Sequence, residues 1–390
     1  MTGTTTTSGG TAAVGRPHGS DAANALTARW AATLDGRSTV LSGAGVHPLL
    51  ALLAPHAAGA ARKELLAVVG DPAAGVDLTG SPGTTLAVSA WTAAGLPLTE
   101  RWLAAVPEPL RRRLTGDPAA DQRALDEWAA GRTDGLIPTV PVKVTPADLM
   151  VLVSALLVRT TWAQPFTERR YVPAAGPWRG RDLTGLHQST GDLGRLRVGS
   201  TPAGPVSLLT VPGTDDVDVL LALGTPGRPA REVLPAAIGA RAGGAELPVT
   251  AGPGVSTRTV TSPSPAPEMH VWTVPFDVSA EHDLLAHADL FGLRAAADPR
   301  TGHFPGISPL PLTVSQARQS ATATFTATGF TAAAVTALSM RFGSAPPRTT
   351  APKEITQLEI TPPFGFLAVH RPTGLVLFAG WVTEPAHPAS

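Results

Sequence analysis

The chain has 390 residues with 30 basic and 30 acidic side chains, so its formal net charge at pH 7 is +0. This balance excludes the strongly basic character by which nucleic-acid-binding domains are usually recognised, and we expect no nucleic-acid partner. The absence of cysteine excludes disulfides and thiol chemistry. A chain of this length can bury about three-quarters of its unfolded surface, which allows a large core.

The N-terminal stretch is rich in Thr and Gly and predicts a disordered arm over residues 1–20. It lacks the apolar run behind a basic start that marks a secretory signal. No stretch of the chain reaches about eighteen consecutive apolar residues, the length that a transmembrane helix needs. We therefore expect a cytoplasmic protein without a membrane partner.

Residues 21–386 mix helical and strand patterns and predict one α+β domain. Helices are expected over residues 21–34, 46–53, 57–69, 100–106 and 122–132. Strands are expected over residues 38–42, 85–91, 149–161, 206–211, 217–223, 271–276, 363–369 and 373–382. The many Pro and Gly residues between 224 and 267 indicate irregular connections.

Residues 326–344, with the sequence TATGFTAAAVTALSMRFGS, are small and nearly uncharged. Loops usually contain more Gly, Pro, Asn and Asp, and core strands usually contain larger side chains. Small residues allow a loop to slip between existing strands without overpacking them. Thr331, Val335 and Thr336 have the β-branched shape that strands accept. The stretch therefore suits a segment that can be either loop or strand.

Part of this stretch resembles the hinge of the reactive-centre loop of serpins, a family of protease inhibitors. The hinge residues are Gly329, Phe330, Thr331, Ala332, Ala333, Ala334, Val335 and Thr336. In that family the loop, here about residues 329–348, is cut by the protease and inserts into the largest sheet as a new strand. The resemblance implies a large, mostly antiparallel central sheet, smaller sheets, about eight or nine helices and an exposed loop.

Other segments resemble serpin motifs in the same order along the chain, namely residues 125–138, 149–166, 303–308 and 363–382. By this resemblance Trp162 marks the breach, where insertion begins, and Ser42, Ser154 and Gln319 fall on the polar shutter beneath the sheet. Six aromatic residues of these motifs are expected to be buried framework: Trp162, Phe166, Phe364, Phe366, Phe378 and Trp381. The bias toward Arg and Ala indicates a GC-rich bacterial genome, such as that of an actinobacterium.

The resemblance implies a suicide-substrate inhibitor of serine proteases, or of cysteine proteases, rather than an enzyme. The protease is trapped as an acyl-enzyme when the cut loop inserts between the strands at residues 149–162 and 320–328, which belong to one sheet. Family spacing places the cut between Gly343 and Ser344. A shift of register offers three other specificity residues, which are Met340, Arg341 and Phe342.

The expected partner is the target protease, and the protein is expected to be a monomer without a cofactor or a metal. Family analogy offers an extracellular location as the alternative. A non-inhibitory serpin that binds or carries another molecule is the alternative function, because several positions depart from the family. Phe330 stands where inhibitors have Thr or Ser, and its ring costs about 1–3 kcal/mol on entering the sheet if no room exists. Gln319 replaces the shutter histidine, and Ser154 and Gly45 also differ from the family pattern.

No motif of enzyme catalysis is recognised, because neither a Gly-x-Ser-x-Gly elbow nor a phosphate-binding loop is present. His282 and His287 lie five positions apart, which does not suit a pair of metal ligands on a helix. Asp215, Asp216 and Asp218 allow a metal cluster, but a solvated turn is the favoured interpretation.

Overall fold

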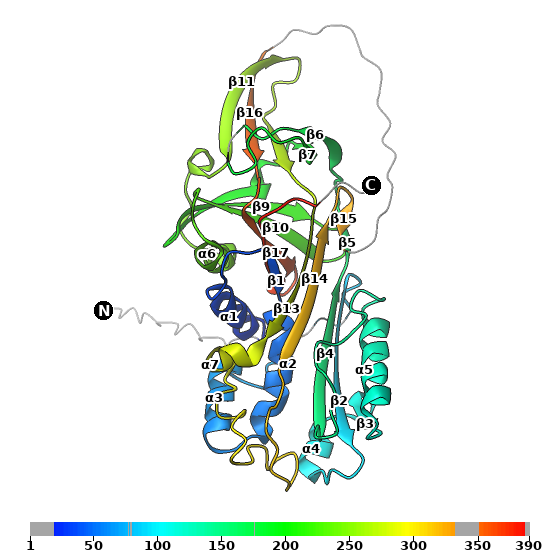
Figure 1. Cartoon of the computed structure of the whole chain (residues 1–390). Coiled ribbons are helices and arrows are strands. Elements are labelled where there is room, and N and C mark those ends of the chain that lie inside the picture. The colour runs from blue at the N-terminus through cyan, green and yellow to red at the C-terminus, as the bar shows by residue number, and fades with distance from the viewer. Residues whose placement is uncertain (1–18, 77, 79, 175, 332–350, 387–390) are drawn as a thin grey trace, which may run out of the picture.

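The computed structural model describes residues 19–76, 78, 80–174, 176–331 and 351–386. Within these ranges the chain has a mixed α+β fold with four sheets, as the sequence predicts (Figure 1). The α-helices are α1 (Gly19–Ala31), α2 (Gly43–Leu53), α3 (Gly59–Val69), α4 (Glu100–Ala105), α5 (Pro118–Arg132), α6 (Ala230–Ala242) and α7 (Ala288–Phe291). These seven described α-helices correct the eight or nine that were expected. None of the described helices is long and apolar enough to cross a membrane.

Two sheets form the upper part of the molecule in Figure 1. The six-stranded sheet has the order β1 (Thr39–Leu41), β18 (Leu375–Val382), β17 (Phe364–His370), β10 (Val217–Gly224), β9 (Gly204–Pro212) and β8 (Leu196–Thr201). The five-stranded sheet has the order β11 (Val255–Ser262), β16 (Ala351–Glu359), β12 (Glu268–Thr273), β7 (Leu183–Thr190) and β6 (Thr167–Tyr171). In the second sheet β16 is paired along both edges, antiparallel with β11 and parallel with β12.

The prediction of irregular chain over residues 224–267 is wrong for two stretches, α6 and β11. Pro229 and Gly243 lie at the two ends of α6, so they mark the limits of a helix instead of preventing one. β11 is rich in Thr and Val, and it becomes a strand because β16 pairs with it along its whole length. That partner lies almost a hundred residues further along the chain, which no local pattern indicates.

The expected large central sheet is divided in two. One part has the order β13 (Phe276–Asp283), β14 (Arg318–Phe325), β15 (Gly329–Phe330) and β5 (Thr160–Thr161). The other has the order β3 (Arg111–Leu114), β2 (Thr84–Ala93) and β4 (Met150–Val158). The expectation that the strands at residues 149–162 and 320–328 share one sheet is therefore wrong for most of their length. Only at one end are they linked, through β15.

We use the name slot for the region where β14 and β4 face each other without pairing (Figure 1). Leu156 and Val158 of β4 and Thr322 and Thr324 of β14 line the same small cavity within it. Within the described residues no strand lies between β14 and β4 below β15. Because β15 is antiparallel to both β14 and β5, the two strands that border the slot run in the same direction.

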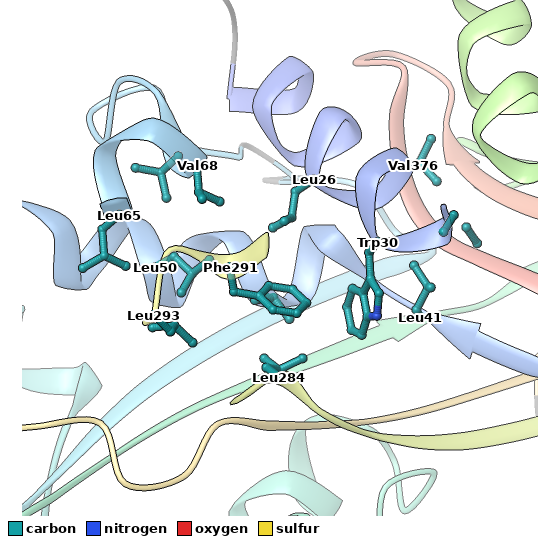
Figure 2. Close-up of a cluster of buried hydrophobic side chains, with 14 of the residues drawn as sticks. Leu26, Trp30, Leu41, Leu50, Leu65, Val68, Leu284, Phe291, Leu293 and Val376 are labelled. Carbon is teal, nitrogen blue, oxygen red and sulfur yellow. The ribbon is translucent and has the colours of Figure 1, made fainter. Parts of the chain in front are cut away.

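Helices α1, α2, α3 and α7 pack together beside the slot around a dense apolar cluster (Figure 2). The ring of Trp30 on α1 contacts the ring of Phe291 on α7 edge to face, with 5.0 Å between their centroids. Leu26 and Leu65 are completely buried in the same cluster. The six framework aromatic residues named above are also buried, as the sequence predicts; the most exposed of them, Phe378, is 6% exposed.

Replacing Phe291 with Ala should lower the free energy of unfolding by about 3–5 kcal/mol, because the ring is fully buried and leaves a cavity. Urea denaturation of the purified protein measures this change. Leu103→Ala is the matched control, since Leu103 is 38% exposed, and we expect a change within about 0.5 kcal/mol. Equal effects of the two substitutions would contradict the described core.

Candidate functional site

The site begins where β14 ends and the chain reverses to form β15. The amide of Thr326 donates to the carbonyl of Gly329 (3.0 Å), and the hydroxyl of Thr326 accepts from the amide of Gly329 (3.2 Å). The amide of Thr331 then donates to the carbonyl of Thr324 (3.0 Å), so the chain after the turn stays paired with β14. The first hinge residues therefore already lie in the sheet.

Gly329 is required at this position because the backbone of β5 passes very close to it. A Cβ atom on Gly329 would lie 2.5 Å from the carbonyl oxygen of Thr160, a distance that side chains do not tolerate. Gly329 and Phe330 pair with Thr161 and Thr160 on one side, while Phe330 pairs with Phe325 on the other. The hinge glycine thus allows a two-residue strand to fit between two neighbours.

The ring of Phe330 already lies in the buried core, so the overpacking cost that was expected for its entry into the sheet does not arise. Its side chain is 2% exposed and lies 6.0 Å from the ring of Phe366, measured between centroids. It belongs to the same buried cluster as Phe325 and Phe276. The expectation failed because the space under the hinge depends on the six-stranded sheet below, whose packing the local sequence does not reveal.

Trp162 lies at the upper end of the slot, where the resemblance places the breach. Its indole N–H donates to the carbonyl of Thr326 (2.9 Å), and its backbone amide donates to the carbonyl of Thr328 (2.9 Å). Its ring also packs against Phe325 with 4.8 Å between centroids. Trp162 therefore joins the chain after β5 to the turn between β14 and β15.

The shutter residues come together at the start of α2. Gln319 on β14 accepts from the amide of Ser42 (2.9 Å) and donates to the carbonyl of Ser42 (2.8 Å). The Ser42 hydroxyl donates to the carbonyl of Leu377 (2.5 Å) and accepts from the amide of Gly45 (3.0 Å). The hydroxyl of Ser154 on β4 donates to the carbonyl of Gly45 (2.5 Å). Both strands that border the slot are thus tied to α2.

His282 lies beside this network and was not identified as part of it from the sequence. It is opposite Gln319 in the pairing of β13 with β14. Its Nε2 atom lies 2.9 Å from the carbonyl oxygen of Val40, a contact that requires the nitrogen to carry a proton and donate. Burial lowers the pKa of His282 below its usual value, which favours the neutral ring. The register of β13 against β14 places this histidine next to the shutter residues, and no local sequence pattern indicates it.

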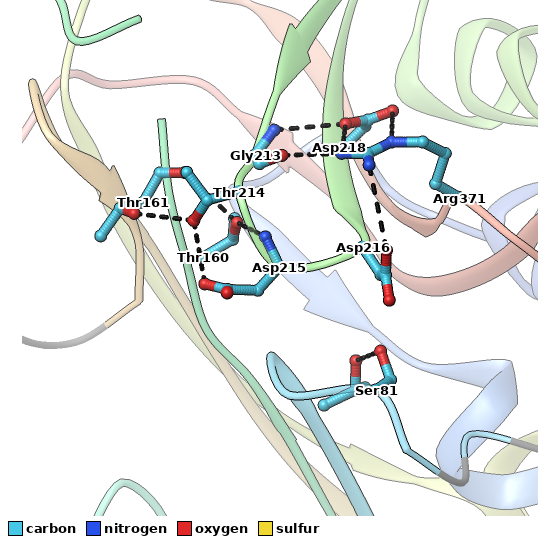
Figure 3. A network of polar contacts seen from close by, with 10 residues as sticks. Ser81, Thr160, Thr161, Gly213, Thr214, Asp215, Asp216, Asp218 and Arg371 are labelled. Carbon is cyan, nitrogen blue, oxygen red and sulfur yellow. Dashed lines mark hydrogen bonds and ion pairs between the residues drawn. The ribbon is translucent and has the colours of Figure 1, made fainter. Parts of the chain in front are cut away.

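A second polar network lies at the hairpin between β9 and β10, next to Thr160 and Thr161 of β5 (Figure 3). Arg371, from the turn between β17 and β18, donates to both oxygens of Asp218 (2.7 and 3.0 Å) and to the carbonyl of Gly213 (2.7 Å). The hydrogen bonds that Arg371 donates to the Asp218 carboxylate raise the pKa of Arg371. The amide of Thr214 donates to the carbonyl of Thr161 (2.9 Å), which joins this hairpin to β5.

The three aspartates of this hairpin do not form a metal centre in the described geometry. Asp218 is bound by Arg371, and Asp216 lies 4.0 Å from the same guanidinium. The amide of Asp215 donates to the hydroxyl of Thr160 (3.4 Å). Among the residues that the structure describes, no group of three or more His, Cys, Asp or Glu side chains is arranged to hold a metal ion.

The remaining hinge and specificity residues lie outside the described part of the chain. These are Ala332, Ala333, Ala334, Val335, Thr336, Met340, Arg341, Phe342, Gly343 and Ser344. The structure therefore places Trp162 and Phe330 near Phe325 at the end of β14, and it gathers the shutter residues separately at the start of α2. The position of the scissile bond stays a prediction.

Replacing Gln319 with Leu should destabilise the protein by about 1–3 kcal/mol, because both backbone groups of Ser42 lose their partner. Chemical denaturation measures the change. Thr322→Val on the same strand is the control, since the hydrogen bond that the structure shows for the Thr322 hydroxyl is an exposed contact with Ser279. A loss no greater than that of the control would mean that Gln319 does not hold the shutter.

The stability of the protein should fall as the pH is lowered from 7 toward 5, in part through His282. The folded state holds the pKa of this ring below its unfolded value of 6.5, so below that pH the unfolded chain takes up the proton first. The stabilisation is therefore complete above pH 6.5 and is lost as the pH falls. His282→Gln should make this pH dependence shallower in denaturation curves, and His47→Gln should act in the same direction because burial also lowers the pKa of His47. An unchanged slope in both variants would contradict the assignment.

The sequence of this chain was compared with protein-family models and with curated proteins. No protein-family model matches the chain. Serpin-Z12 of rice (Oryza sativa subsp. japonica) is 28% identical over 151 residues, which cover 34% of this chain and 35% of the relative. The match therefore spans about a third of the length of that curated relative.

Solved structures match almost the whole chain. A cleaved serpin 42Da has a TM-score of 0.69 and 17% identity, and the match covers 95% of this chain and 99% of the other. Thyroxine-binding globulin in complex with thyroxine has a TM-score of 0.64 and 16% identity, with 95% and 98% covered. The strand pairing around the slot and these matches agree: the chain has the serpin fold.

Proposed function

We propose that the protein inhibits serine proteases, or cysteine proteases, by inserting its cleaved loop between β14 and β4. The observation that carries this proposal is β15. Two hinge residues already lie between β14 and β5, the short strand that follows β4; Gly329 pairs with β5, and Phe330 pairs with both neighbours. The residues that follow, from Thr331 to Thr336, are small or β-branched and can continue that strand.

The register of β15 specifies how the strand would continue. Phe330 is opposite Phe325 and Thr160, so six residues further on Thr336 would lie opposite Gln319 and Ser154 at the shutter. Side chains alternate along a strand, and therefore residues 332, 334 and 336 would point inward with Phe330. These residues are Ala, Ala and Thr, which are small enough for a slot bordered by Ala321 and Ala323.

Backbone hydrogen bonds supply the driving force. The facing edges of β14 and β4 are unpaired with each other below β15. A strand inserted between them gains partners on both sides, and each net hydrogen bond contributes about 0.5–1.5 kcal/mol. An inserted strand of about fourteen residues spans roughly 45 Å, enough to carry an attached protease from one end of the slot to the other.

A direct test mixes the protein with a panel of serine and cysteine proteases and searches for an adduct that survives SDS electrophoresis. Cleavage of the loop should also raise the melting temperature. If no protease gives an adduct and the cut protein melts at the temperature of the intact one, trapping by insertion is wrong. A binding function on the same fold, as thyroxine-binding globulin has for thyroxine, then remains.

Neighbouring residues of the inserted strand would point to opposite faces of the sheet, so the same substitution at residues 333 and 334 tests the two faces. Ala334→Arg places a charge inward and should convert the protein into a substrate that is cut without forming an adduct, because a buried unpaired charge costs several kcal/mol. Ala333→Arg places the same charge outward and should leave adduct formation within about twofold of the wild type. Adduct yield per cut chain is the measurement. Equal yields for the two variants would contradict the proposed register.

A further inference from the structure

The lower end of the slot contains a partly open, mainly apolar cavity of about 260 Å³. Met150 and Leu152 of β4 line one side, and the chain leading into β14 lines the other. Leu50, Leu293 and Phe304 form a floor in which each side chain is at most 3% exposed. A dry apolar cavity of roughly 150 Å³ is sufficient to hold benzene, so this one can accept a somewhat larger ring system.

The mouth of the cavity is crossed by a short polar bridge. Gln316 donates to the carbonyl of Lys143 (2.9 Å) and accepts from its amide (3.1 Å). The Ser315 hydroxyl donates to Asp148 (3.3 Å). These hydrogen bonds join the segment before β14 to the segment before β4, and they fix the width of the mouth.

The charges at the mouth are not balanced. The cavity is lined by two basic residues, Lys143 and Arg318, and by one acidic residue, Asp148. Asp148 already accepts from the amide and hydroxyl of Thr145 (2.8 Å each) and from Ser315. Arg318 faces Asp283 at 3.7 Å, whereas the Lys143 ammonium makes no ion pair with any side chain in the described part of the chain.

We propose that this cavity binds a compact apolar molecule that carries one carboxylate. The rings or chain occupy the space above Leu50 and Phe304, and the carboxylate lies at the mouth near Lys143. Small-molecule sites have this composition, with an apolar lining and a few polar groups that orient the ligand. The proposal concerns the uncut protein and does not depend on protease trapping.

The test uses 1-naphthoate, a bicyclic aromatic carboxylate, and calorimetric titration of the intact protein. We expect one site with a Kd on the order of 0.1 mM, as ordinary ligand efficiency gives for a molecule of this size. The neutral analogue 1-naphthalenemethanol should bind at least about tenfold more weakly, because it lacks the charge-assisted contact with Lys143. Equal affinities for the two molecules would overturn the assignment of a carboxylate.

Three variants locate the site. Ala147→Trp narrows the mouth at an exposed lining position and should abolish binding without lowering the melting temperature. Lys143→Gln should weaken 1-naphthoate about tenfold and leave 1-naphthalenemethanol unchanged. Lys63→Gln, on exposed α3 surface away from the lining, is the matched control and should bind as the wild type does. Absence of saturable binding, or unchanged binding in Ala147→Trp, would overturn the proposal and leave the cavity to the chain's own inserted strand.

Discussion

The structure depends on two strand edges that face each other without pairing. β14 and β4 run in the same direction on either side of the slot, and in the described residues they are linked only at one end, where β15 lies between β14 and β5. Buried backbone N–H and C=O groups normally form hydrogen bonds, so these two open edges can each accept a further strand. The fold does not remove these edges; it separates them and holds them apart.

Three sets of contacts keep the separation. Trp162 and the turn at Thr326 close the slot at the top, and Gln319 and Ser154 tie its two borders to α2 in the middle. Gln316 bridges to Lys143 at the bottom. Each set joins segments far apart in the sequence, so the spacing of the borders is a property of tertiary structure and does not arise from either strand alone.

Much of this site could be predicted from sequence motifs, and the remainder could not. Trp162 and Ser42 were assigned from motifs and Gln319 from its spacing to Gly329. The structure places Trp162 against the turn at Thr326, and Ser42 and Gln319 against each other at the start of α2. His282 escaped notice because only the pairing of β13 with β14 sets it opposite Gln319. The room around Phe330 depends on Phe366, which belongs to another sheet. The division of the central sheet likewise depends on long-range pairing, which local propensity does not encode.

The double pairing of β16 has a consequence for the topology of the chain. β16 starts directly after the segment that the structure leaves undescribed, and β11 and β12 hold it on both edges. Removing β16 from the sheet would break two hydrogen-bonded ladders at once, so β16 firmly anchors the chain that precedes it. β15 anchors the chain at the other end of the same segment. The number of residues between two fixed ends limits how far an uncut strand could extend from β15 into the slot. Under the proposed trapping mechanism, hydrolysis of one peptide bond between β15 and β16 would free the strand that follows β15 from this limit.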